Sequence, residues 1–274
     1  MTNFPKFTFF GTDEFSVAVL EELAKADCRP EHIITTPGVT PVKLWAEGNR
    51  IPYSQPTDLK SYQLSAISYQ LALVASYGKI IPKEILDLPT HGTLNIHPSL
   101  LPKYRGATPI QSAILDGLTE SGVTLMLMDE KVDHGPILGA TSCQLLGASF
   151  LEAREKMGKI GAELFLANAQ RWVAGEIKAV PQDHSQATYT KKINKEDGLI
   201  NFEDTPEINY RKFLAYCGWS GSYFFTERNG KKVRVIVTAA NIENGQFTLH
   251  RVKPEGKKEM SIEAFNHGTK TPTN

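Results

Sequence analysis

Short apolar runs that alternate with helix-like patterns constrain the fold of this chain more than any other feature. The run Leu71–Ala75 (LALVA) is apolar throughout, as expected for a parallel strand that is covered on both faces. Similar short runs occur at Lys6–Phe10, His32–Thr35 and Thr93–His97. Apolar residues at helical spacing lie between them. This alternation predicts right-handed β–α–β crossovers and a mostly parallel sheet with helices on both faces.

The same pattern continues to about residue 175 and then changes. Further strands are predicted at Val123–Met128 and Ile137–Cys143, and a long helix at Phe150–Gly175. Beyond residue 205, short strand-like runs are separated by turn signals such as Asn244-Gly245. We therefore expect an α/β, Rossmann-like catalytic domain at 1–183, a linker at 184–206 and a small β-rich domain at 207–274.

Two local features refine this expectation. Thr12 is placed to cap the helix that follows the first strand. Turn residues at Arg228-Asn229-Gly230 separate two predicted strands of the small domain, and the residues from about Gly268 are expected to be disordered.

Composition narrows the functional classes. The hydrophobic fraction is 41% and the charged fraction 22%, ordinary values for a globular protein. No apolar run approaches the roughly 18 residues that span a bilayer, and Met1–Pro5 lacks the features of a signal peptide. We expect a cytoplasmic monomer without a membrane partner. Cys28, Cys143 and Cys217 lack CxxC spacing, so neither a disulfide framework nor a metal site is expected.

Charge is unevenly distributed although the net charge is zero. From Thr205 to Asn274 there are 11 Lys and Arg residues against 6 Asp and Glu residues, a net charge of +5, so the first 204 residues carry −5. A small basic domain after an acidic one can be a phosphate-binding surface. An ordinary solvated surface explains the same numbers.

Polar residues end one of the predicted parallel strands. In Asn95-Ile96-His97, residues i and i+2 of a strand point to the same side. Ligands of such sheets bind beyond the carboxyl ends of the strands. An amide donor beside an imidazole can stabilise an oxyanion and move protons, although a hydrogen-bonded structural histidine fits this pair too.

An acidic loop with a Gly-Pro break joins the next two predicted strands. Within it, Asp133 could approach His97 and hold the imidazole in place. A solvated loop is the alternative for Asp133, as it is for Asp129 and Glu130. The chain has no GxGxxG, P-loop, HExxH or GxSxG motif, so dinucleotide, zinc-protease and serine-hydrolase sites are not indicated.

The stretch Pro82–Leu138 contains N-x-H, then S-L-L-P, then an Asp in a D-x-G loop, and it resembles the core of the folate-dependent formyltransferases. The resemblance implies that Asn95, His97 and Asp133 are the catalytic groups. An amine would attack the formyl carbon of 10-formyltetrahydrofolate, the co-substrate. Asn95 and His97 would stabilise the oxyanion, and Asp133 would orient the histidine.

Finer motifs are similar to the methionyl-tRNA branch of that superfamily, which acts in translation initiation. They are Arg105-Gly106-Ala107-x-Pro109-Ile110-Gln111, Gly11-Thr12-Asp13-Glu14-Phe15 with Asp13 at a usual Pro, and Ala187-Thr188-Tyr189 through Glu196-Asp197-Gly198. The resemblance implies acceptor contacts from Thr12, Phe15, Arg105 and Gly106. It implies folate contacts from Tyr77, Gly78, Ile80, Ser99, Leu100, Leu101, Pro102 and Asp129.

One departure keeps other acceptors open. The branch usually carries a basic, Gly-rich loop after the second strand, whereas residues 36–41 here read TPGVTP without an arginine. Basic residues further along could compensate, and the candidates are Lys191, Lys192, Lys231, Lys232 and Arg234. An N-formyltransferase for a nucleotide-linked amino sugar would not need the loop. A hydrolase of the same folate and a non-enzymatic RNA-binding protein are further alternatives.

Overall fold

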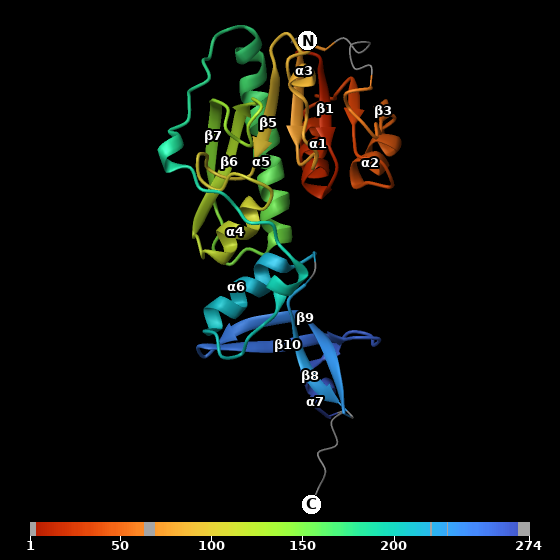
Figure 1. Ribbon diagram of the computed structural model, residues 1–274, viewed down its shortest axis with the longest axis vertical. Coiled ribbons are helices and arrows are strands. Elements are labelled where there is room, and N and C mark those ends of the chain that lie inside the picture. The colour runs from red at the N-terminus through yellow and green to blue at the C-terminus, as the bar shows by residue number, and fades with distance from the viewer. Residues whose placement is uncertain (1–3, 63–68, 220, 229, 268–274) are drawn as a thin grey trace, which may run out of the picture. The chain divides into compact units, whose positions relative to one another are not determined.

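The computed structural model describes residues 4–62, 69–219, 221–228 and 230–267 (Figure 1). The chain forms two compact units. The first comprises Met1–Pro109, Glu120–Gln144 and Glu152–Lys191, and the second comprises the remaining segments, chiefly Lys192–Asn274. Residues 184–191, expected to belong to a linker, therefore pack with the first unit. The disorder expected from Gly268 and the turn expected at Asn229 fall on residues outside the described ranges.

A seven-stranded sheet with the order β3-β2-β1-β4-β5-β6-β7 forms the centre of the first unit. The strands are β1 (Phe7–Gly11), β2 (His32–Ile34), β3 (Tyr53–Ser54), β4 (Leu71–Ala75), β5 (Thr93–His97), β6 (Glu120–Leu127) and β7 (Ile137–Gln144). The first five strands in the sheet order are parallel, whereas β6 is antiparallel to both β5 and β7. The predicted mostly parallel sheet is thus confirmed.

Helices cover both faces of this sheet. The helices of the α/β pattern in this unit are α1 (Glu14–Lys25), α2 (Pro41–Asn49), α3 (Lys83–Leu86) and α5 (Phe150–Val173), whereas α4 (Pro109–Leu115) lies in a segment that clusters with the second unit. On one face, Phe165 of α5 packs against Phe7 of β1, with ring centroids 5.2 Å apart. On the other face, Ile85 of α3 joins a buried cluster with Phe10 and Val74. Phe7 and Phe10 of β1 therefore point to opposite faces of the sheet, because side chains alternate along a strand.

The first helix begins one residue later than expected. Asp13, not Thr12, is the N-cap of α1, and its carboxylate accepts from the backbone N–H groups of Phe15 and Ser16. The same side chain accepts from the hydroxyl of Ser76, at the carboxyl end of β4. The expectation for Thr12 was wrong: its hydroxyl donates to the carbonyl of Tyr77, and its backbone N–H donates to Oγ of Ser16 inside the helix.

The second unit contains an antiparallel sheet of order β11-β10-β9-β8, which confirms the small β-rich domain. Its elements are β8 (Tyr223–Arg228), β9 (Lys231–Glu243), β10 (Gln246–Pro254), β11 (Met260–Ser261), α6 (Pro206–Tyr216) and α7 (Ile262–His267). Val235, Val252 and Phe265 form its buried core. The 3₁₀ turn Lys195–Gly198 precedes α6 in this unit, whereas the 3₁₀ turn His184–Gln186 belongs to the first unit. None of the helices in the described ranges is long and apolar enough to cross a membrane.

Candidate active site

Strand β5 places two polar side chains on one face of the large sheet. Ile96 is 1% exposed and lies close to Gly161 of α5, so Asn95 and His97 point to the opposite face. Both are buried, with 8% and 4% of their surface exposed. The Nε2 atom of His97 lies 2.9 Å from the carbonyl oxygen of Tyr104. Since a carbonyl oxygen only accepts, Nε2 carries a proton and Nδ1 is free to gain or lose one.

Asp133 reaches the same histidine from the loop between β6 and β7. Its Oδ1 lies 3.5 Å from Nδ1 of His97, and its Oδ2 accepts from the backbone N–H of Gly106 at 2.7 Å. The loop leaves the sheet beside Leu94, the partner of Leu127 in the antiparallel pair, so it has to turn back along the sheet. The three expected catalytic groups are thus gathered, with a carboxylate facing the nitrogen that exchanges protons.

Arg105 lies inside the protein and leaves almost none of its side chain for an acceptor. It is 1% exposed. Its guanidinium donates to Oε1 of Gln182 at 2.6 Å and approaches Nδ1 of His184 at 2.9 Å. It also lies over the ring of Tyr189, 5.9 Å from the centroid. The next residue, Gly106, contributes its backbone N–H to Asp133. Arg105 and Gly106 therefore hold residues of the site in place through hydrogen bonds inside the protein.

The loop Ser99–Pro102, expected to bind folate, is fixed to β6. The hydroxyl of Thr124 donates to the carbonyl of Ser99 at 2.7 Å and accepts from the backbone N–H of Leu101 at 3.1 Å. Ser99 is fully buried, and its own hydroxyl donates to the carbonyl of Lys103 at 2.7 Å. Leu100 and Pro102 are half-buried and offer the accessible surface of this loop.

A second expected folate segment follows β4. Tyr77 is 2% exposed, and burial raises the pKa of its phenol. Its carbonyl accepts from the hydroxyl of Thr12 at 2.8 Å. Gly78 and Ile80 are exposed, the latter to 89%. Phe15, expected to contact an acceptor, is 3% exposed and packs within the core.

Asp129, the last expected folate ligand, belongs to a cluster that the sequence did not reveal. Its carboxylate lies 2.6 Å from Nδ1 of His134. The ring of His134 stacks on that of His184, with centroids 3.9 Å apart and planes at 10°. Burial, followed by the charges of His134 and Arg105, lowers the pKa of His184. His184 is therefore favoured as a neutral acceptor for the Arg105 guanidinium.

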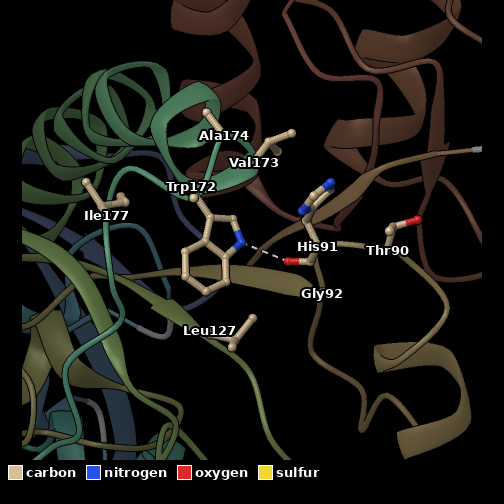
Figure 2. Close-up of a pocket in the computed structure, with 9 residues that line it drawn as sticks. Thr90, His91, Gly92, Leu127, Trp172, Val173, Ala174 and Ile177 are labelled. Atoms are coloured by element: carbon tan, nitrogen blue, oxygen red, sulfur yellow. Dashed lines mark hydrogen bonds between the residues drawn. The ribbon is translucent and has the colours of Figure 1, made fainter.

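A separate hollow of about 500 Å³ lies at the other end of β5 (Figure 2). Trp172 forms one wall and donates from Nε1 to the carbonyl of His91 at 2.8 Å. Gly92 and Leu127 are also part of the lining. Asn95 and His97 are absent from that lining, so we do not connect the hollow with the chemistry. In the described residues, no cluster of three or more His, Cys, Asp or Glu side chains is arranged to hold a metal ion.

Comparison with known proteins shows the family to which the chain belongs. Residues 39–159 match the family model described as formyl transferase. A methionyl-tRNA formyltransferase of Chloroflexus aurantiacus is 37% identical over 252 residues, which cover 86% of this chain and 81% of the relative. The corresponding protein of Thermus thermophilus is 36% identical over 263 residues, which cover 90% and 85%.

Solved structures with the same fold include formyltransferases of two classes, methionyl-tRNA formyltransferases and sugar N-formyltransferases. The methionyl-tRNA formyltransferase from Clostridium thermocellum matches with a TM-score of 0.64 at 16% identity, over 91% of this chain and 98% of that one. An N-formyltransferase from Helicobacter canadensis, in complex with folinic acid and dTDP-3-aminofucose, matches with a TM-score of 0.61 at 21% identity, over 87% and 89%. The fold alone therefore does not separate the two classes, whereas the identities of 37% and 36% to the methionyl-tRNA formyltransferases of Chloroflexus aurantiacus and Thermus thermophilus show the family. By those identities, this chain belongs to the methionyl-tRNA formyltransferase family.

Proposed function

We propose that this enzyme transfers the formyl group of 10-formyltetrahydrofolate to the α-amino group of initiator methionyl-tRNA. The observation that carries the proposal is the pairing of buried His97 with half-buried Asp133 beside Asn95, in a chain that is 37% identical to a methionyl-tRNA formyltransferase. We further propose that it works in the cytoplasm as a monomer, which light scattering would test against the chain mass of 30.4 kDa.

The reaction needs charge stabilisation and one proton relay. The amine nitrogen attacks the formyl carbon, a C–N bond forms, and negative charge develops on the formyl oxygen. The Asn95 amide donates to that oxygen, and a protonated His97 stabilises it electrostatically. When the intermediate collapses, the bond from the formyl carbon to the folate nitrogen breaks and that nitrogen takes up a proton. Asp133 accepts the proton lost by the amine, directly or through Nδ1 of His97, and this proton returns to the folate nitrogen as the bond to the formyl carbon breaks.

A basic, aromatic face of the second unit supports a nucleic-acid acceptor. Phe225 of β8 pairs with Arg234 of β9, and alternate residues share a face, so Tyr223 and Lys232 lie on it too. The guanidinium of Arg234 lies 3.9 Å from the ring centroid of Tyr223, and Nζ of Lys232 lies 4.1 Å from that of Phe225. Phe225 is 42% exposed. Cations beside aromatic rings suit phosphates and unpaired bases.

Not all of the basic candidates belong to this face. Lys231 precedes Lys232 on β9 and therefore points to the opposite side. Lys191 and Lys192 are exposed and lie outside the sheet.

The salt dependence of tRNA binding tests whether this basic, aromatic face contacts phosphates. Each phosphate contact contributes about 0.9 to the slope of log affinity against log salt for a duplex. The double variant Lys232→Ala/Arg234→Ala should therefore lower the magnitude of the slope for tRNA by about 1.8. Lys257→Ala/Lys258→Ala removes two exposed charges from the turn after β10 and is the matched control. Equal slopes for both double variants would exclude this face.

A second candidate function follows from the connection between β2 and α2. Only six residues separate Ile34 from Pro41, and the hydroxyl of Thr40 caps α2 by accepting from the N–H of Lys43. Such a short segment leaves no room for a long basic loop, which favours a nucleotide-linked amino sugar as acceptor. Formyl transfer measured with initiator methionyl-tRNA and with a panel of such sugars separates the two candidates. Transfer to a sugar alone would overturn the tRNA proposal.

A further inference from the structure

The backbone of Asp133 adopts a conformation that its surroundings must maintain. Its φ is +48°, in the left-handed region that L side chains rarely occupy. Such a residue persists where neighbouring groups over-determine its conformation. The direction of its carboxylate depends on this backbone, because the carboxyl group is only one carbon away from Cα. Whatever holds the backbone of Asp133 therefore also aims its side chain.

Gln182 holds that backbone from outside the loop. Its side-chain nitrogen donates to the carbonyl oxygens of Asp133 at 2.9 Å and of Gly135 at 2.7 Å. Gln182 is 6% exposed, so water cannot easily replace these hydrogen bonds. One amide thus fixes two of three successive peptide groups in the loop.

Gln182 is itself oriented by a buried cation. The guanidinium of Arg105 donates to its Oε1 at 2.6 Å, which fixes which end of the amide faces the loop. The backbone N–H of Gly106, the next residue, donates to Oδ2 of Asp133. The segment 105–106 therefore supports Asp133 twice, once through Gln182 and once directly.

We propose that Gln182, oriented by Arg105, is a positioning residue that aims the Asp133 carboxylate at Nδ1 of His97. The role rests on the proposed function, because it matters only if Asp133 handles protons during formyl transfer. Gln182 touches neither substrate nor the reacting atoms in this scheme. It acts through the loop backbone alone.

The variant Gln182→Glu tests the role with almost no change of shape. The carboxylate keeps its contact with the Arg105 guanidinium, where the added charge strengthens the hydrogen bond. It replaces the donor that serves Asp133 and Gly135 by an acceptor, which repels both carbonyls. A displacement of the catalytic group by about 1 Å costs on the order of 100-fold in rate. We therefore expect kcat to fall roughly 10- to 100-fold, with little change in KM for the folate.

A double-mutant cycle separates positioning from a general structural effect. If Gln182 acts through Asp133, then Gln182→Glu should change kcat by less than about twofold in an Asp133→Asn background. Gln186→Glu is the matched control, because Gln186 is exposed in the same segment and its side-chain amide, in the contacts described, donates only to the carboxylate of Asp183. It should leave kcat within about twofold of wild type.

Amide exchange at Gly106 gives a readout that does not depend on activity. Its N–H should exchange faster in Gln182→Glu than in Gln186→Glu, at equal thermal stability. The positioning role would be overturned if Gln182→Glu kept the wild-type kcat or left the exchange rate of the Gly106 amide unchanged. It would also be overturned if Gln182→Glu lowered kcat by the same factor in the wild-type and Asp133→Asn backgrounds. Failure of the wild-type enzyme to formylate methionyl-tRNA would overturn the proposed function instead, and Gly106 exchange would still decide whether Gln182 holds the loop.

Discussion

A single methyl group added at Gly161 of α5 should disturb both the packing of the large sheet and the active site. A Cβ at this position would overlap Cγ2 of Ile96 and lie 3.4 Å from Cγ1 of Val123. Ile96 is 1% exposed and cannot swing into solvent. Overpacking of this kind costs up to about 3 kcal/mol, whereas Ala in place of Gly in a helix gains about 1 kcal/mol. Gly161→Ala should therefore lower the free energy of unfolding by about 2 kcal/mol.

The position of Ile96 gives the same variant a kinetic effect. Ile96 lies between Asn95 and His97, so relief of the overlap shifts both groups. We expect kcat to fall about tenfold or more. Urea denaturation and formyl-transfer kinetics on the same preparation measure both effects.

Gly48→Ala supplies the control. Gly48 lies in α2 with no atom within 4 Å of an added Cβ, so this change should raise stability by up to about 1 kcal/mol. If Gly161→Ala were as stable and active as Gly48→Ala, the close packing of α5 on β5 would be refuted.

Three further predictions concern the site, the histidines and the thiols. Asp133→Asn should lower kcat by about 100-fold or more while circular dichroism stays native, and full activity would remove Asp133 from the mechanism. Burial lowers the pKa of His32, and that of His184 is lowered too, so the unfolded chain binds more protons than the folded one below pH 6.5. Stability should therefore fall as pH drops from 6.5 through these lowered values, and the urea midpoints at about pH 7.5 and about pH 5 should differ less in His32→Asn. Burial raises the pKa of the Cys28 thiol to about 12, so iodoacetamide should label Cys217, which is half-buried, well before Cys28 unless urea is present.

The sequence predicts those helices and strands whose own residues show a clear apolar or periodic pattern. β4 and β5 have the expected bounds. For β4 the reason is that a parallel strand covered on both faces is apolar along its whole length. The antiparallel direction of β6 is not visible in its apolar run, since periodicity contains no direction. The two-residue β3 and the four-residue α3 are too short to show any period.

The candidate site, too, could be predicted from the sequence only in part. His97 and Asp133 stand in recognisable motifs, and the structure brings them to 3.5 Å. The interior place of Arg105 could not be foreseen, because its partner Gln182 is 77 residues away and lies in a segment without pattern. An arginine in a motif next to a predicted site looks like a substrate ligand until the fold shows what surrounds it.

The hydrogen bonds to the Asp133 loop also impose an order on synthesis. Asp133 leaves the ribosome 49 residues before Gln182, the residue that fixes its backbone. At about 5 to 20 residues per second, that interval lasts roughly 2 to 10 s. All seven strands of the large sheet have been made by residue 144, yet the hydrogen bonds to the Asp133 backbone are not complete until residue 182 follows. A nascent chain can thus complete its sheet before it can complete its active site.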